Sequence, residues 1–253
     1  MKNILSTFLC CLTMSILLNS CEKNVVAPPV APTFGNVKVS FNLQQSGVDY
    51  TIGDTILHPS LNRKYLISTL KFYANYMKLV STTGVEVDVN EFYLYESYDV
   101  KSITASVPAG TYNKIKYDVG VKEKINHENP NIYPLGHPLA VSSSMNWGQT
   151  LGYLFLMLEG YTDPTGSASI FSNFKYDCGL DSLYKSVTLP ITAVTIAENA
   201  TTPIEIQIDV NQLFDGNAGN VDIVNNNITH STGVLGFQTA NTVLDNFVGA
   251  TSF

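Results

Sequence analysis

Residues 37–43 read Val37-Lys38-Val39-Ser40-Phe41-Asn42-Leu43, with an apolar side chain at every second position. Because a β-strand points successive side chains to opposite faces, this alternation predicts a strand with one buried face. The segment Lys114-Ile115-Lys116-Tyr117-Asp118-Val119 repeats the pattern. Between the two lies Val107-Pro108-Ala109-Gly110-Thr111-Tyr112, which predicts a turn joining neighbouring antiparallel strands, since its glycine can adopt a positive φ.

Short segments of the same kind, bounded by turn residues, recur along the chain beyond residue 35. We expect strands over residues 36–43, 65–79, 91–98, 102–107, 112–119, 151–159, 186–190 and 203–210. Fourteen Tyr and twelve Phe favour strands over helices. Helix is expected only as one turn over residues 210–214 and as a segment over residues 234–248. The fold class predicted for residues 36–253 is therefore all-β, an antiparallel β-sandwich with little helix.

Residues 120–146 are expected to form a long irregular loop, because they hold three Pro and two His without any strand periodicity. Loops longer than about 12–15 residues in a compact domain are usually functional or disordered. Strong strand patterns flank this loop, and it carries aromatic, His and Met side chains. We therefore predict that it contributes to a functional site.

The N-terminus predicts export. Lys2 precedes an apolar run over residues 4–18, which is the layout of a signal peptide over residues 1–20 and is too short to span a bilayer comfortably. Leu17-Leu18-Asn19-Ser20-Cys21 resembles a bacterial lipobox, so Cys21 is expected to be the lipid-anchored first residue of the mature protein, with a Pro-containing tether over residues 21–35. The expected location is a bacterial membrane, on the periplasmic or surface face of the outer membrane. The alternative is an ordinary secretory signal that leaves Cys21 a plain thiol.

Composition narrows the classes of function. The chain has 14 Lys plus Arg against 21 Asp plus Glu and lacks a basic block, so nucleic acid is not expected as a partner. The common hydrolase, phosphate-binding and redox motifs are absent, and an enzyme is not expected. Once Cys10 and Cys11 leave with the signal peptide and Cys21 is acylated, Cys178 is the remaining thiol. We expect it to be buried or to bind a metal.

Metal binding is the remaining chemistry. The four His residues, His58, His127, His137 and His230, all fall in predicted loops, so none is expected in the core. His127 and His137 share the long loop that leads to Met145 and Trp147. Imidazole and thioether donors suit copper.

A second group offers oxygen donors, which calcium prefers: Asp215, Asn217, Asn220 and Asp222. Their spacing does not match an EF-hand loop, which requires Gly at the sixth and Glu at the twelfth position. A solvated turn is therefore favoured over a calcium site.

Several motifs occur in one order along the domain. They are Leu70-Lys71-Phe72-Tyr73-Ala74-Asn75, Pro108-Ala109-Gly110-Thr111-Tyr112, Tyr117-Asp118-Val119-Gly120-Val121, Ile125-Asn126-His127, Pro138-Leu139, Met145-Asn146-Trp147, Gly152-Tyr153, Leu158-Glu159-Gly160 and Ile208-Asp209-Val210-Asn211. Taken together they resemble the MbnP-like copper-binding domain, which occurs with methanobactin systems and in many exported bacterial lipoproteins.

The resemblance implies a copper site made of imidazoles and a Trp that a partner di-haem, peroxidase-like enzyme oxidises to kynurenine. An intact indole nitrogen is only a donor, whereas opening the ring leaves an aromatic amine whose lone pair can bind a soft metal. By position, the resemblance assigns His127 as a ligand and Trp147 as the candidate modified residue.

Two departures from the family pattern concern the same site. Gln149 stands where the family usually has a second Trp, and Asp177 stands where it usually has a His. A carboxylate is a poor Cu(I) ligand, and the adjacent Cys178 should point to the opposite face of a strand. The expected metal ligands are His127 and His137, with Asp177 or Cys178 in place of the missing imidazole. The alternative is a metal-free structural or interaction module.

Overall fold

A computed structural model describes residues 31–253, and Pro32–Phe253 form one unit in it. The expected signal peptide, Cys21 and most of the expected tether lie outside the described residues. No helix in the described part of the chain is long and apolar enough to cross a membrane.

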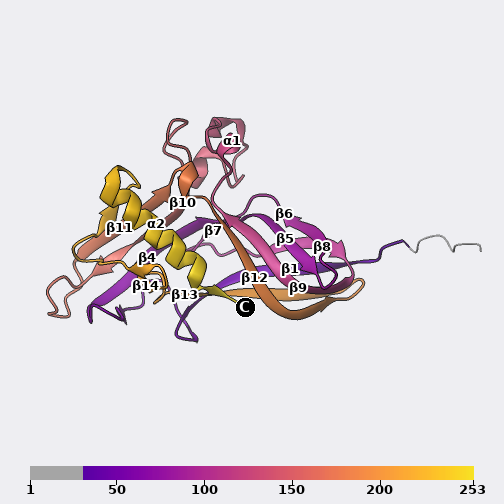
Figure 1. Cartoon of the computed structure of the whole chain (residues 1–253), viewed down its shortest axis with the longest axis horizontal. Helices are drawn as coiled ribbons and strands as arrows, with labels where there is room; N and C mark the ends of the chain where they lie inside the picture. Colours follow the sequence, from indigo (N-terminus) through magenta and orange to yellow (C-terminus); the bar gives the residue numbers. More distant parts are fainter. Residues whose placement is uncertain (1–30) are drawn as a thin grey trace, which may run out of the picture. The chain divides into compact units, whose positions relative to one another are not determined.

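The domain consists of three main β-sheets and one long helix (Figure 1). The first sheet contains β17 (Thr251–Ser252), β13 (Thr201–Asp209), β1 (Phe34–Gln45), β2 (Val48–Asp49) and β8 (Ile103–Pro108). The second contains β16 (Ile228–Thr229), β11 (Ser172–Gly179), β10 (Leu154–Thr162), β4 (Lys64–Tyr73), β3 (Ile56–Leu57) and β7 (Leu94–Glu96). The third contains β12 (Lys185–Ile196), β9 (Gly110–Val119), β5 (Asn75–Ser81) and β6 (Glu86–Asn90).

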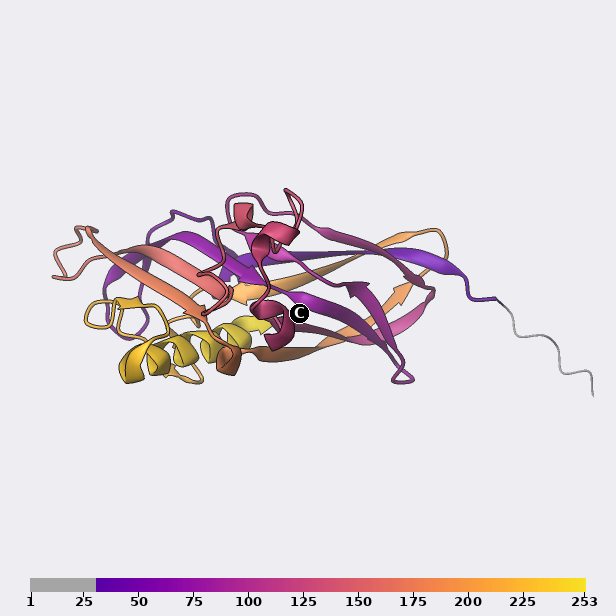
Figure 2. The same ribbon diagram turned by 90° about the horizontal axis from the view of Figure 1, so that it is seen from above.

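The remaining elements are short, apart from one helix. They are the two-stranded sheet of β14 (Asp215–Gly216) and β15 (Gly219–Asn220), α1 (Glu123–Asn126), three 3₁₀ turns over Pro130–Ile132, Val141–Ser143 and Asp181–Leu183, and α2 (Gly233–Ala250). Helix α2 runs alongside the strands (Figure 2) and confirms the helix expected over residues 234–248.

The alternating segment over residues 37–43 forms β1, and its four apolar side chains are buried as predicted. Each such side chain contributes about 1.5–3 kcal/mol when it is fully buried. The ring of Phe41 contacts Phe72 of β4 at 5.1 Å and Tyr117 of β9 at 5.7 Å, measured between ring centroids. The three sheets therefore share one core, and α2 joins it through Phe247, 4.6 Å from Phe72. The all-β sandwich is confirmed, although β1 pairs with β13 and β11 with β16 in parallel.

Two local predictions were wrong. The strand expected over residues 65–79 is two strands in different sheets, because Tyr76 adopts a φ of 53° and β5 is bulged there. The turn expected over residues 107–112 does not join paired strands, since β8 pairs with β1 while β9 pairs with β5 and β12. Both segments carry the chain from one sheet to another, which local alternation does not reveal.

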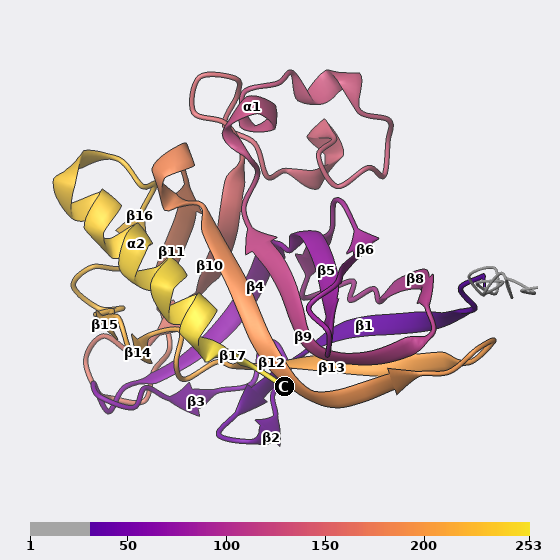
Figure 3. The ribbon, with the colours of Figure 1, turned by 45° about the vertical axis from the view of Figure 1, so that its right-hand side comes forward.

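The long loop leaves the C-terminal end of β9 and lies beyond the sheets (Figure 3). Side chains from the sheet beneath hold it in place. The hydroxyl of Tyr73 donates to the carbonyl of Pro138 (3.0 Å), that of Tyr153 to Leu139 (2.7 Å), and the ammonium of Lys71 to Ser143 (3.3 Å). The loop contains only short helical turns of its own, and these hydrogen bonds hold it against the domain beneath.

Candidate metal centre

The end of β11 carries the first part of the candidate site. Successive side chains of a strand point to opposite faces, and here Tyr176 and Cys178 enter the core. Asp177 and Gly179 therefore belong to the other face. The side chain of Asp177 is only 5% exposed, so this carboxylate lies in a covered position on that face.

Asp177 is paired with His230. Its Oδ2 lies 3.0 Å from Nδ1 of His230 and 3.4 Å from the ammonium of Lys175. Its Oδ1 is buried and makes no hydrogen bond within the described part of the chain. Burial raises the pKa of Asp177, and the charges of Lys175 and His230 offset part of that increase. Burial opposes the charged form of Asp177, and a positively charged neighbour stabilises that form.

The backbone around His230 is fixed to β11. Strand β16 runs parallel to β11, with Ile228 opposite Lys175. Three residues after Ile228, Ser231 adopts a φ of 59°, donates its hydroxyl to the carbonyl of Asp177 (3.0 Å) and accepts from the amide of Gly179 (3.1 Å). His230 is thus held between two points that are each hydrogen-bonded to β11.

Trp147 lies against Gly179. A Cβ atom built on Gly179 would be 3.0 Å from Cζ3 of Trp147 and 2.6 Å from the carbonyl of Tyr153, so only glycine fits there without a shift. The indole meets the His230 ring edge-on, with centroids 6.5 Å apart. The Trp147 amide donates to the carbonyl of Gly152 (2.9 Å), which closes a small loop. Trp147 and His230, 83 residues apart by number, therefore share one site.

His127 is held by Asp181, which lies two residues after Gly179, whereas Asp177 lies two residues before it. Its Nε2 lies 2.8 Å from Oδ2 of Asp181 and its Nδ1 lies 2.7 Å from the carbonyl of Gln149. Both partners are acceptors, so both ring nitrogens carry protons when the two bonds are made. The hydrogen bond to Asp181 raises the pKa of His127, and that to Gln149 raises it further. With both bonds made, neither ring nitrogen of His127 has a free lone pair for a metal.

Asn126 supports this second pair. Its side-chain nitrogen donates to Oδ1 of Asp181 (2.8 Å) and its oxygen accepts from the amide of Tyr153 (2.7 Å). The residue is fully buried. The side-chain amide of Asn126 therefore fixes both Asp181, which holds His127, and the backbone at Tyr153, which follows the Trp147 loop.

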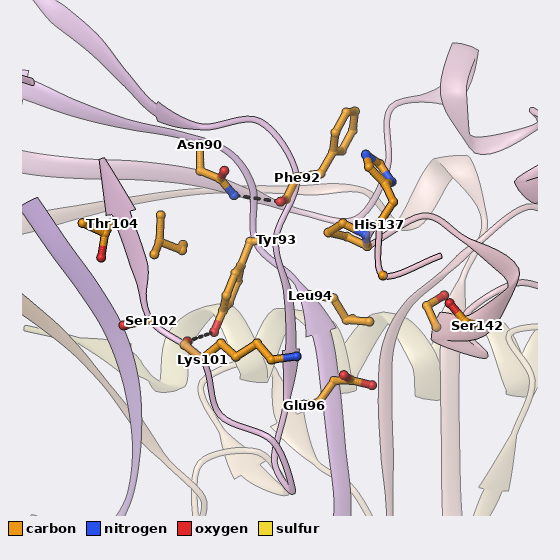
Figure 4. Close-up of a pocket in the computed structure, with 14 residues that line it drawn as sticks. Asn90, Phe92, Tyr93, Leu94, Glu96, Lys101, Ser102, Thr104, His137 and Ser142 are labelled. Atoms are coloured by element: carbon orange, nitrogen blue, oxygen red, sulfur yellow. Dashed lines mark hydrogen bonds between the residues drawn. The ribbon is translucent and has the colours of Figure 1, made fainter. Parts of the chain in front are cut away.

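His137 lies in a different part of the long loop. Its ring stacks on Tyr133 with centroids 4.6 Å apart and packs beside Phe92, at one edge of a cleft of about 370 Å³ (Figure 4). Its Nδ1 accepts from the amide of Leu139 (3.1 Å), and burial lowers its pKa. The structure does not bring His137 to His127, which contacts Asp181 and Gln149 instead.

The other ligand candidates are also separated from one another. Cys178 is fully buried on the core side of β11, and burial raises the pKa of its thiol, so it does not take the place of the missing imidazole. Within residues 31–253, no group of three or more His, Cys, Asp or Glu side chains is placed to hold a metal ion. The predicted set of His127, His137, Asp177 and Cys178 therefore does not form one cluster.

The two carboxylates among the oxygen donors considered for calcium, Asp215 and Asp222, accept hydrogen bonds from other residues of the domain. Asp222 accepts from the amides of Val224 (2.9 Å) and Asn225 (3.0 Å), which closes a turn. Asp215 accepts from the hydroxyl of Ser60. These bonds agree with the solvated turn that the spacing favoured.

One prediction about His residues was wrong. His58 is fully buried, and its Nδ1 accepts from the amides of Ser60 (3.3 Å) and Leu61 (3.2 Å). Its neighbours along the chain are turn residues, but the turn is folded against the aromatic core. The sequence also gave no reason to prefer His230, whose approach to Asp177 depends on the pairing of β16 with β11.

The layered sheets and the indole and imidazole side chains at the end of β11 define an all-β sandwich with a candidate metal centre at one strand end. The model of the MbnP family matches residues 31–232, and the chain belongs to this family. A solved structure, MbnP from Methylosinus trichosporium, has a similar fold, with a TM-score of 0.53 and 16% sequence identity over 76% of this chain and 80% of that chain. No curated protein matches this chain.

Proposed function

We propose that this member of the MbnP family is an exported lipoprotein that binds copper at His230, beside Trp147, and that it has no catalytic activity of its own. Family membership and the geometry at the end of β11 support the proposal. The single observation that carries it is the contact of His230 with Asp177.

A metal-binding His usually donates one ring N–H to a carboxylate, which fixes the ring and leaves the other nitrogen free for the metal. Nδ1 of His230 faces Asp177, so its proton belongs there and Nε2 keeps its lone pair. Within the described residues, Nε2 makes no hydrogen bond, and the side chain is 53% exposed. Asp177 is then not a substitute ligand but the carboxylate that orients His230.

Trp147 lies where a second donor is needed. Its indole is edge-on to His230, and oxidation would convert the indole nitrogen to an aromatic amine whose lone pair can bind a soft metal. We include in the proposal a partner di-haem enzyme that carries out this oxidation. His127 contributes only after it releases Asp181 or Gln149.

The anchor is proposed from Cys21 alone, on the periplasmic or surface face of the outer membrane. Replacement Cys21→Ala should move the protein from the membrane fraction to the soluble fraction. A variant that remains in the membrane fraction contradicts lipidation at this residue.

Copper binding is tested on the full chain, purified in detergent from its own host. Cu(I) is titrated in competition with the chromophoric chelator bathocuproine disulfonate, and the peptide that contains Trp147 is analysed by mass spectrometry. His230→Gln should weaken Cu(I) binding at least tenfold. The matched control, His137→Gln, removes an imidazole that stacks on Tyr133 and should leave the affinity unchanged.

If the wild-type protein leaves all copper with the chelator, the proposal fails. The alternative then applies, in which the chain is a metal-free interaction module with the same β-sandwich fold. Equal losses of affinity in His230→Gln and His137→Gln would also contradict a site at His230.

A further inference from the structure

The cleft beside His137 is formed by three segments that are distant in sequence. The start of β8 lies on one side and the long loop on the other, with the chain from the end of β6 to β7 between them (Figure 4). The cleft has a volume of about 370 Å³, which lies within the range of about 300–1,000 Å³ for small-molecule sites. None of Asp177, His230 and Trp147 lines it, so the cleft is separate from the candidate metal centre.

Hydroxyl groups line both sides of the cleft. Ser102 and Thr104 belong to the side of β8, and Ser142 belongs to the long loop (Figure 4). All three residues are exposed, and their hydroxyls make no hydrogen bond within residues 31–253. Because a hydroxyl can both donate and accept, these groups offer a ligand either kind of hydrogen bond from two sides.

Two further polar groups of the cleft keep one free hydrogen-bonding atom each. Nδ1 of His137 accepts from the amide of Leu139, so the neutral ring carries its proton on Nε2, where it can be donated to a ligand. The side-chain nitrogen of Asn90 donates to the carbonyl of Phe92 (2.7 Å), which fixes the amide and leaves its oxygen as an acceptor. The cleft thus combines a fixed donor, a fixed acceptor and several hydroxyls.

The charged side chains of the cleft are already neutralised. Lys101 is paired with Asp99 at 2.7 Å, and Glu96 is paired with Lys71 at 2.8 Å. Neither an anion nor a cation would therefore meet an unmatched opposite charge. The electrostatics of the cleft favour a neutral ligand.

Apolar surface lies beside these polar groups. Phe92, Leu94 and Pro138 line the cleft and are each partly exposed. A wholly apolar ligand would cover them but would also cut off the hydroxyls and the His137 N–H from water, and each polar group left unpaired costs free energy. The ligand that fits has many hydroxyl groups together with a face of C–H groups.

We propose that this cleft binds a small neutral carbohydrate, a mono- or disaccharide. Sugar hydroxyls donate and accept as the hydroxyls of Ser102, Thr104 and Ser142 do, and the C–H face of a sugar ring can pack against Phe92. The inference is independent of copper binding, since the two sites share no residue.

The test is saturation-transfer difference NMR on the full chain, held in a detergent that has no sugar headgroup. The probes are D-glucose, D-galactose and N-acetyl-D-glucosamine, each added separately. The wild type should transfer saturation to the ring protons of at least one of them, with an effect that saturates as the sugar concentration rises. Wild-type protein that transfers saturation to none of the three overturns the proposal.

Two variants with the same substitution locate the binding. Ser102→Trp places a large side chain in the cleft from an exposed position and should weaken binding at least tenfold. The matched control Ser106→Trp changes an exposed residue of β8 that does not line the cleft, so it should bind as the wild type does. Thermal unfolding followed by circular dichroism verifies that both variants fold. Equal binding by Ser102→Trp and the wild type places the sugar elsewhere and overturns the assignment.

A smaller change tests a single hydrogen bond. Thr104→Val keeps the shape of the side chain but removes its hydroxyl, and it should weaken binding about 2- to 10-fold, which corresponds to one hydrogen bond. Unchanged binding in Thr104→Val would contradict the part of this hydroxyl in the site.

Discussion

Two carboxylate–imidazole pairs lie on either side of Gly179, and they differ in what they leave free. Asp177 and His230 share one hydrogen bond, with the carboxylate nearly buried and one ring nitrogen unused. Asp181 and His127 are both about one third exposed, and both ring nitrogens of His127 are occupied. The Asp177–His230 pair thus leaves one ring nitrogen without a hydrogen bond, whereas the Asp181–His127 pair, here called the clamp, leaves none.

The difference shows that hydrogen-bond partners decide the role of a His more than its place in a motif does. His127 follows a family motif, yet its acceptors Asp181 and Gln149 consume both nitrogens. His230 belongs to no motif, yet its Nδ1 is bonded to Asp177 while its Nε2 makes no hydrogen bond within the described residues. Three predictions test this contrast, in order of decreasing effect.

The largest effect is expected from Asn126→Ala, which removes the side chain that holds Asp181 in the Asp181–His127 pair. The change leaves the Tyr153 amide without its partner in a buried position and removes one hydrogen bond from Asp181. The free energy of unfolding should fall by about 2–4 kcal/mol. Urea denaturation measures it, and the exposed Asn131→Ala should change it by less than about 0.5 kcal/mol. A loss below about 1 kcal/mol for Asn126→Ala would show that this amide is not the support of the clamp.

The second effect distinguishes the role of Asp177 from that of Asp181. Asp177→Asn should weaken copper binding about 10- to 100-fold because His230 loses its charged partner, whereas Asp181→Asn should change it less than about threefold. In the copper-free protein, Asp177→Asn should not reduce stability, since it removes a carboxylate whose pKa is raised by burial. Chelator competition and urea denaturation measure the two quantities. Equal copper losses in both variants would erase the distinction between the pairs.

The smallest effect is a pH dependence of the clamp. The folded-state pKa of His127 is raised, first by Asp181, so its contribution to stability is complete below the unfolded pKa of about 6.5 and is lost as pH rises through the folded pKa. The wild type should therefore lose more stability than His127→Gln when the pH is increased through this range. Thermal unfolding at several pH values measures the difference, and parallel curves for the two proteins would contradict an imidazolium at His127.

The strands with strict alternation could be predicted from the sequence because their burial depends on local order alone. Val37 to Leu43 is the clearest case, and the helix near the C-terminus was predicted for the same reason. The break at Tyr76 could not be predicted, since it depends on which sheet each half joins. Strand β11 was not among the predicted strands, yet its opposed faces at Asp177 and Cys178 followed from the alternation of any strand.

The site was less predictable because its residues come together through strand pairing. His230 reaches Asp177 only through the parallel contact of β16 with β11. His58 was assigned to a loop and lies in the core, because the core that covers it is formed by distant aromatic residues. The structure brings Asp177 and Trp147, both named from the sequence, to the end of β11, but the sequence did not indicate His230 as their neighbour.

The burial of Cys178 has a consequence for chemical durability. Copper that cycles between two oxidation states generates oxidants, and an accessible thiolate beside it would be converted to sulfenic acid and beyond. Here the sulfur lies in the core on the opposite side of β11 from Asp177, and its raised pKa keeps it protonated. The strand itself therefore separates the thiol from the proposed copper site, so that repeated copper loading there should neither oxidise this residue nor link two copies of the chain through it.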